Sequence, residues 1–198
     1  MRTLSFIPAL LLCLTIVSCS GRFTRSELAL IRNTDPLMRV LTVNDSSDLN
    51  ILRSISSDLS GKSLMSDEFK RLSEKMVRTV TDPSQDGVGI AAPQVGINRR
   101  IVAVQRFDKE GFPFEVYANI RIIWASDSLE YGPEGCLSVP DRRREVKRSR
   151  KIVIEYADPE AVEKNFVPVV RDTVTGFTAV IFQHETDHLD GILYTDRL

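Results

Sequence analysis

Apolar residues recur every three or four positions between residues 69 and 80, which is the spacing of one face of an α-helix. Ser66 precedes this segment and is followed by two acidic residues, the composition typical of a helix start. Asp82-Pro83 follows it, and proline disfavours helical backbone in the residue before it. The pattern predicts a helix that begins after Ser66 and ends before Asp82. Its apolar positions are Phe69, Leu72, Met76, Val77 and Val80.

Shorter apolar segments with the composition of β-strands follow this helix. They lie at residues 101–104, 120–123, 151–156 and 166–170. A second helix is predicted from about residue 176 to residue 189. A helix, several strands and a final helix in this order predict the α+β fold class, with mostly antiparallel sheets packed around a central helix.

The N-terminus has the composition of a targeting segment. A short positive start precedes an apolar run over residues 4–17 that is too short to span a membrane comfortably, so residues 1–18 are predicted to be a signal peptide. The run ends in Ile-Val-Ser-Cys19, which resembles the lipobox of bacterial lipoproteins, where the cysteine becomes the acylated first residue. We therefore expect a lipid anchor on Cys19, a tether over residues 19–37 and a location on a membrane of the cell envelope. The alternative is translation from Met38, which would give a cytoplasmic protein.

The remaining residues, 38–198, are predicted to form one globular domain, because the chain is 42% hydrophobic and 27% charged. The net charge of −1 argues against a nucleic-acid partner. Cys13 and Cys19 belong to the N-terminal segment, which leaves Cys136 as the single thiol of the domain. No disulfide is therefore expected within it.

Both histidines of the chain, His184 and His188, lie in the run Gln-His-Glu-Thr-Asp-His-Leu-Asp-Gly at 183–191, inside the second predicted helix. A spacing of four places both imidazoles on one helix face, where they can bind one metal ion. Glu185 occupies the position of the general base in H-E-x-x-H metallohydrolases. The alternative is a histidine pair on a solvated helix face.

A third metal ligand must come from another residue type, because the sequence contains no third histidine. Tyr194 stands where one class of H-E-x-x-H enzymes has that histidine, so Cys, Asp and Glu upstream are the candidates. Cys136 lies in Gly-Pro-Glu-Gly-Cys-Leu-Ser-Val-Pro at 132–140, a composition that predicts a sharp turn presenting one side chain. A lone cysteine is often a small buried hydrophobe. Beside an incomplete metal site, Cys136 is better interpreted as a thiolate ligand.

A glycine-containing run, Gly-Val-Gly-Ile-Ala-Ala-Pro-Gln-Val-Gly, occupies residues 87–96. Its pattern is a poor match to the dinucleotide fingerprint, because proline and the apolar segment at 101–104 predict a loop and then a strand where the fingerprint requires a helix. Gln94 offers a side-chain amide near the end of this run.

The three motifs at 87–94, 134–138 and 183–191 resemble, in this order and spacing, those of the peptide deformylases. The resemblance extends from about residue 41 to residue 198. The sequence departs from the family pattern at Asp141, where glycine is frequent, and it has no C-terminal helical extension after Leu198 of the kind that many bacterial members carry.

The resemblance implies a metal-dependent hydrolase that removes the formyl group from N-formylmethionyl peptides and releases formate. Cys136, His184 and His188 would hold one divalent metal ion, with Fe²⁺ expected and Zn²⁺ or Ni²⁺ able to replace it. Glu185 would be the general base. The developing oxyanion would be stabilised by the metal, the side-chain amide of Gln94 and the backbone N–H of Leu137.

The resemblance also implies a peptide-binding site. The substrate backbone would pair with Gly89, Ile90 and Gly135, and the methionine side chain would enter an apolar pocket. The predicted walls of that pocket are Val88, Phe177, Val180 and Ile181. These four could equally be ordinary core residues. The basic residues 142–144 and 147–148 are predicted to lie in a solvated loop, with attraction of peptide carboxylates as the alternative.

Two other functions compete with this prediction. A metallopeptidase or other amidase acting on exported peptides is the alternative enzyme, and a purely structural metal site is the alternative without catalysis. Export would also separate the enzyme from nascent cytoplasmic chains, so secreted formyl peptides or signal-peptide fragments are the expected substrates in that case. We expect the protein to be a monomer.

Overall fold

The computed structural model describes residues 21–163 and 166–197. The predicted signal peptide and Cys19 lie outside this part of the chain. The first predicted helix is confirmed as α4 (Asp67–Val80), and the side chain of Ser66 caps it by accepting a hydrogen bond from the backbone N–H of Phe69. Its predicted apolar face packs into the main core, in which Leu72, Met76 and Val80 are fully buried.

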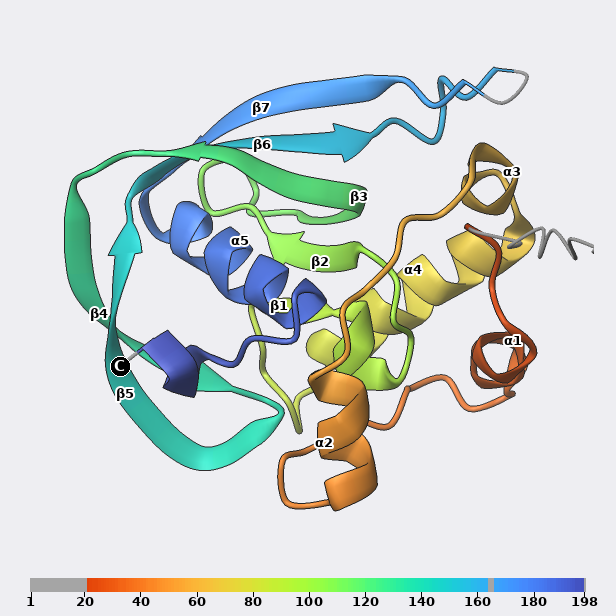
Figure 1. Cartoon of the computed structure of the whole chain (residues 1–198), viewed down its shortest axis with the longest axis horizontal. Helices are drawn as coiled ribbons and strands as arrows, with labels where there is room; N and C mark the ends of the chain where they lie inside the picture. The colour runs from red at the N-terminus through yellow and green to blue at the C-terminus, as the bar shows by residue number, and fades with distance from the viewer. Residues whose placement is uncertain (1–20, 164–165, 198) are drawn as a thin grey trace, which may run out of the picture.

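Five strands form one antiparallel sheet in the order β1-β2-β3-β6-β7. They are β1 (Gly89–Ala91), β2 (Ile101–Gln105), β3 (Phe114–Ala125), β6 (Lys151–Ala157) and β7 (Val169–Thr175). Two further strands, β4 (Leu129–Cys136) and β5 (Val139–Ser149), pair only with each other and form a long curved ribbon beside the sheet (Figure 1). Every strand pair is antiparallel.

Helix α5 (Gly176–Leu189) occupies the centre of the molecule, between the sheet and the ribbon (Figure 1). Its ends agree with the predicted helix. The ring of Phe182 on this helix packs edge-on against Tyr117 of β3, with the ring centroids 4.9 Å apart. Most of the second half of α5 is buried, including polar residues that a surface helix would expose to water. The predicted α+β fold, with antiparallel sheets around this helix, is confirmed.

Two local predictions differ from the structure. The strand predicted at 166–170 begins only at Val169. The glycine run contains the short strand β1 and a 3₁₀ turn, η1 (Ala92–Val95), where only a loop was predicted. Three residues of alternating pattern are too few to distinguish a strand from a loop, and β1 forms because β2 offers it a pairing edge.

The prediction that residues 19–37 form a tether is wrong for the described residues 21–37. Helix α1 (Arg25–Arg32) lies within it and packs against α4, with Ile31 fully buried in the main core. The carboxylate of Glu27 accepts hydrogen bonds from the buried guanidinium of Arg99 at 2.9 Å. Residues 21–37 are therefore part of the folded domain, and the domain extends further upstream than residue 38.

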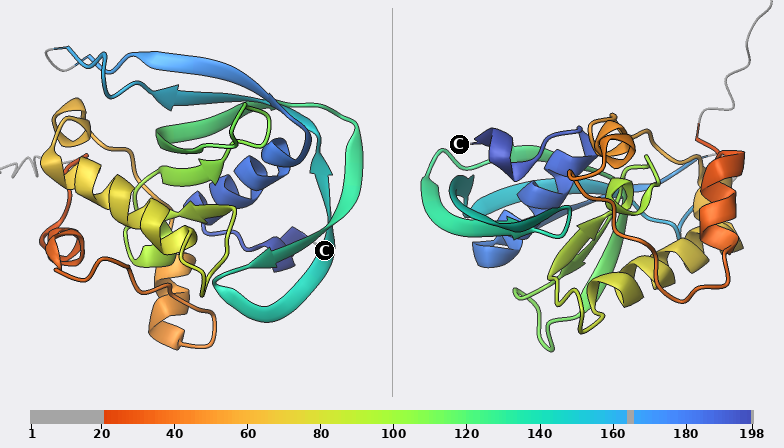
Figure 2. Two further views of the ribbon diagram at one scale, coloured as in Figure 1. Left: turned by 180° about the vertical axis from the view of Figure 1, so that it is seen from behind. Right: turned by 90° about the horizontal axis from the view of Figure 1, so that it is seen from below.

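The remaining helices are short. They are α2 (Ser46–Leu52), α3 (Gly61–Leu64) and the C-terminal 3₁₀ turn η2 (Tyr194–Arg197). None of the helices within the described residues has the length and apolarity needed to cross a membrane. Helices α1 and α3 lie at one end of the molecule, and the β4–β5 ribbon lies at the other (Figure 2).

Candidate functional site

The predicted metal ligands converge. His184 and His188 face the ribbon from successive turns of α5, and Cys136 is the last residue of β4, just before the tight turn into β5. One donor atom from each lies within 4.8 Å of the others. The Sγ atom of Cys136 is 3.2 Å from Nε2 of His188. A thiolate and two imidazoles at this spacing match a three-ligand site that leaves a coordination position open, so this cluster could hold a metal ion.

The charge state of Cys136 favours this use. Burial by itself raises the pKa of the thiol, but the adjacent His188 and His184 outweigh it and lower the pKa well below its usual value. A thiolate is the form that binds metal ions.

Glu134 and Arg148 hold the first histidine in place, and the sequence analysis did not identify either role. Nδ1 of His184 lies 2.8 Å from Oε2 of Glu134, so the Nδ1–H donates to this carboxylate and leaves Nε2 free for the cluster. Arg148 donates two hydrogen bonds to the same carboxylate, at 2.7 Å and 3.0 Å. Burial opposes the charge of Glu134, but the bonds from His184 and Arg148 outweigh it and lower the pKa of Glu134 to about 2.

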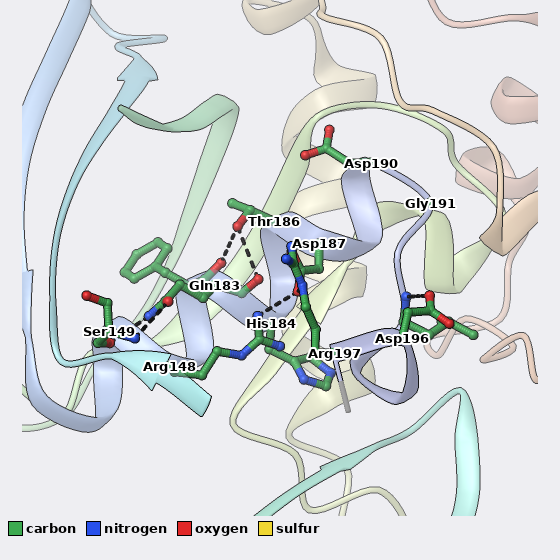
Figure 3. A network of polar contacts seen from close by, with 12 residues as sticks. Arg148, Ser149, Gln183, His184, Thr186, Asp187, Asp190, Gly191, Asp196 and Arg197 are labelled. Atoms are coloured by element: carbon green, nitrogen blue, oxygen red, sulfur yellow. Dashed lines mark hydrogen bonds and ion pairs between the residues drawn. The ribbon is translucent and has the colours of Figure 1, made fainter. Parts of the chain in front are cut away.

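The same arginine connects this ribbon to the helix. Its Nη1 donates to Oδ2 of Asp187 at 2.6 Å, and Arg197 from η2 donates to both oxygens of Asp187 (Figure 3). Asp187 precedes His188 on α5. The strand that carries the cysteine and the helix that carries the histidines are thus joined by one buried network of charges.

Glu185 points into a cavity beside the cluster. Its side chain is 4% exposed, and its Oε2 is one of the buried atoms without a hydrogen-bond partner among the described residues. Burial raises the pKa of Glu185 to about 7, with the nearby histidines opposing the rise. A carboxylate with a free oxygen and a raised pKa has the properties of a general base that works near neutral pH.

Both predicted oxyanion donors lie beside Cys136. Gln94 is buried, and its Oε1 accepts a hydrogen bond from the backbone N–H of Ala91, which fixes the direction of the amide. Its Nε2 is 3.2 Å from Oγ of Ser138 and 3.5 Å from the sulfur of Cys136. Leu137 follows the cysteine and lines the cavity.

The cavity has a volume of 730 Å³ and includes His184, Glu185 and Cys136 in its wall. It is bounded by all but one of the predicted substrate-binding residues: Val88, Gly89, Gly135, Phe177, Val180 and Ile181. Ile90 was predicted to pair with the substrate through its backbone, and its side chain is fully buried in the main core on the other face of β1. Successive side chains of a strand point to opposite faces, so Gly89 faces the cavity and Ile90 has only backbone groups to offer at the strand edge.

The strand arrangement leaves room for an extended ligand. β1 is the edge strand of the sheet, with β2 on its other side. Gly135 lies on β4, across the cavity from β1. A peptide in the cavity could therefore pair its backbone with an open strand edge.

The basic residues after the cysteine motif were predicted to lie in a solvated loop. They lie instead in strand β5. Arg142 and Arg143 line the mouth of the cavity, whereas Arg148 faces inward and is only 5% exposed. The sequence of a basic run does not show which of its side chains is buried. Arg148 is buried because it pairs with two buried carboxylates.

Comparisons with known proteins agree with this site. The sequence model of the polypeptide deformylase family matches residues 37–198. A peptide deformylase of Leptospira biflexa is 37% identical over 75% of this chain and 82% of its own length. Peptide deformylase 2 of Gloeobacter violaceus is 38% identical over 82% of this chain and 80% of its own length. The Met-Ala-Ser-bound crystal structure of a class I type b peptide deformylase from Acinetobacter baumannii has a TM-score of 0.70 and 33% identity, and the match covers 82% of this chain and 98% of that one. The chain therefore belongs to the peptide deformylase family of enzymes.

Proposed function

We propose that this protein is a metal-dependent hydrolase that removes the formyl group from N-formylmethionyl peptides and releases formate. The observation that supports it most directly is the buried Glu185 carboxylate, which has a free oxygen beside an open three-ligand cluster at the wall of a peptide-sized cavity. The related Acinetobacter baumannii enzyme binds Met-Ala-Ser. That tripeptide is what remains when formyl-Met-Ala-Ser loses its formyl group.

Cys136, His184 and His188 would hold one divalent ion, for which the donor set of one thiolate and two imidazoles suits Fe²⁺, Zn²⁺ or Ni²⁺. We propose Fe²⁺ as the native ion. When bound, such an ion polarises a carbonyl group and lowers the pKa of water.

The residues of the chain would carry the proton and the developing charge. Glu185 removes a proton from the attacking water as the new C–O bond forms at the formyl carbon. The side-chain amide of Gln94 and the backbone N–H of Leu137 donate hydrogen bonds to the formyl oxygen as it becomes negative, and such donors lower barriers by about 3–4 kcal/mol each. Glu185 then returns the proton to the amine nitrogen as the C–N bond breaks, and the formic acid that leaves ionises to formate.

Substrate binding follows from the geometry of the cavity. The peptide would extend along the open edge of β1 at Gly89 and face Gly135 on the ribbon. Its methionine side chain would contact the apolar wall formed by Val88, Val180 and Ile181. Phe177 is 49% exposed at the rim and would contact the more distant part of the substrate.

The test is formate release from formyl-Met-Ala-Ser by the full chain, loaded anaerobically with Fe²⁺ and separately with Zn²⁺. Glu185→Gln should lower kcat by about 10²–10⁴-fold, because a positioned general base contributes that much. Glu160→Gln removes an exposed carboxylate and is the matched control. No formate from folded, metal-loaded protein would refute the proposal, and cleavage of unformylated peptides would point to a peptidase.

We further propose that the mature protein begins at an acylated Cys19 and is held on a membrane of the cell envelope, as a monomer. The lipobox motivates this location, and the packing of α1 supports a start upstream of Met38. A chain that began at Met38 would lose Glu27, the partner of buried Arg99, and Ile31 from the core. Such a chain would also lack the carbonyl of Asn33, which accepts a hydrogen bond from buried Lys75 at 3.2 Å.

Mass spectrometry of the N-terminal peptide from a membrane fraction tests the location. A diacylated Cys19 is the expected result, and an intact Met38 N-terminus in the cytosol would refute it. Light scattering of the detergent-solubilised protein measures its mass and so tests whether it is a monomer.

A further inference from the structure

Gly21 is the first residue that the structure describes. The carbonyl of Gly21 accepts hydrogen bonds from the backbone N–H of Ser60 at 2.8 Å and from Oγ of Ser63 at 2.7 Å. Its φ of +88° is a conformation that favours glycine, and a Cβ there would lie 2.6 Å from the nitrogen of Ser60. This residue is therefore tightly held against the start of α3.

The proposed lipid anchor is very close to this point, because Ser20 alone separates Cys19 from Gly21. An extended chain spans roughly 3.3–3.6 Å per residue, so the two steps reach roughly 7 Å at most. An acylated Cys19 would hold the end of the molecule around Gly21 directly against the bilayer. There is no long tether that would allow the domain to turn freely.

Apolar side chains are exposed around this end. Met65, just after α3, is 58% exposed, and Phe166 in the connection between β6 and β7 is 71% exposed. The two lie in neighbouring segments, because the side chains of Val162 and Val167 from the same connection pack over Gly61 at the start of α3. Large exposed apolar side chains beside a lipid attachment point are suited to the interfacial region of a bilayer.

The exposed charges nearest Gly21 are balanced in sign. Arg22, Arg25 and Lys62 are exposed, and none of them forms an ion pair within residues 21–163 and 166–197. The opposing exposed carboxylates are Asp67 in the first turn of α4 and Glu160 and Glu163 in the β6–β7 connection. Each basic residue near an anionic membrane contributes about 1 kcal/mol of attraction, which these carboxylates offset, so the anchor and the apolar side chains hold this surface on the bilayer.

The catalytic cavity lies away from this end. Helix α4 begins beside α3 and ends at Val80, whose carbonyl accepts a hydrogen bond from the N–H of Gly87, a residue of the cavity wall. Its 14 residues at about 1.5 Å per residue make ~21 Å of helix between the two places. Figure 2 shows the same arrangement, with α1 and α3 at one end of α4.

We propose that Arg22, Arg25, Lys62, Met65 and Phe166, the basal surface, rest on a phospholipid bilayer and hold the cavity roughly 20 Å above it. This inference rests on the acylation of Cys19 proposed above and adds the orientation of the enzyme. An extended chain rises roughly 3.3 Å per residue, so a formylmethionine must stand about six residues clear of the bilayer to enter the site. Soluble formyl peptides would reach it freely, whereas short formylated ends of membrane segments would not.

The test uses tryptophan fluorescence, because Trp124 is the single tryptophan of the chain. Trp124 is 50% exposed and pairs with Val153 near the start of β6, at the opposite end of that strand from the β6–β7 connection. The full chain would be reconstituted into vesicles of equal parts phosphatidylglycerol and phosphatidylcholine brominated on one acyl chain. The wild type is compared with Met65→Trp and Phe166→Trp, each in a Trp124→Phe background.

Emission from Met65→Trp and Phe166→Trp should be roughly halved relative to unbrominated vesicles, since interfacial side chains lie roughly 5–10 Å into the boundary of headgroups and acyl chains, within reach of the bromine. Emission from Trp124 should not change. Quenching of Trp124 without quenching at positions 65 and 166 would overturn the orientation, as would no quenching at all in protein whose mass confirms acylation. Absence of lipid on Cys19 would overturn the anchor and the orientation together. None of these results depends on formate release, so the catalytic proposal is tested separately.

Discussion

Gly89 is the position where adding a single carbon should disturb the general base. A Cβ built there would lie 2.6 Å from Oε1 of Glu185 and 2.7 Å from Cγ2 of Ile181. Non-bonded heavy atoms prefer separations of about 3.5–4.0 Å, so Gly89→Ala requires a shift of roughly 0.8–1 Å on at least one side. Glu185 and Ile181 are both on the rigid, buried helix α5, which limits how the shift can be shared.

The magnitude follows from that displacement. Misplacing a reacting group by about 1 Å can cost about 10²-fold in rate, so Gly89→Ala should lower kcat/KM by about 10–100-fold. Stability should change less. Overpacking costs about 1–3 kcal/mol, but replacing glycine also restricts the unfolded chain and contributes about 0.4–1 kcal/mol in the opposite direction.

The assay is formate release from formyl-Met-Ala-Ser, measured beside thermal unfolding of the same preparations. Gly132→Ala is the matched control, because a Cβ at this strand glycine would meet Nη2 of Arg150 at 3.6 Å, an ordinary contact. The control should keep wild-type kcat/KM. Equal activity of Gly89→Ala and wild type would refute the assignment of Glu185 as a base fixed by this contact.

Three further predictions concern stability and metal binding. Arg148→Met should lower the free energy of unfolding by about 3–5 kcal/mol in a urea titration, because it leaves two buried carboxylates without this cationic partner. The control Arg150→Met breaks a more exposed ion pair and should lower it by no more than about 1 kcal/mol. Ile31→Ala should cost about 2–5 kcal/mol because Ile31 is fully buried, and the neighbouring Leu30→Ala, at 43% exposure, should cost clearly less; equal effects would mean that α1 is not docked. A chelator should abolish formate release and lower the Tm, since an ion that binds only the folded state stabilises that state. An unchanged Tm with full activity would show that no metal is needed.

The principal residues of the candidate site were predictable from the sequence because their chemistry is local. A spacing of four on a helix brings His184 and His188 to one face whatever the rest of the chain does. Glu185 follows from its place between them, and Cys136 follows because it is the single thiol left for the domain. The ends of α4 and α5 were also predictable, since capping residues and helical periodicity are read within one segment.

Contacts between distant segments were not predictable in the same way. The hydrogen bond from His184 to Glu134 and the pairing of Arg148 with Asp187 join residues between 39 and 50 positions apart. Nothing in a run of basic residues distinguishes the buried Arg148 from its exposed neighbours. Burial depends on which strand packs against which helix, and that is decided only when the ribbon folds over α5.

An error in the sequence analysis has the same origin. Residues 21–37 were interpreted as a tether, although α1 within them is capped by Thr24 and docked through Ile31 and Glu27. A helix of eight residues is marginal in isolation and is stable here because α4 and Arg99 provide its contacts. The sequence by itself thus determined the reactive groups and the helices that carry them, whereas tertiary packing decided which faces, charges and terminal residues surround them.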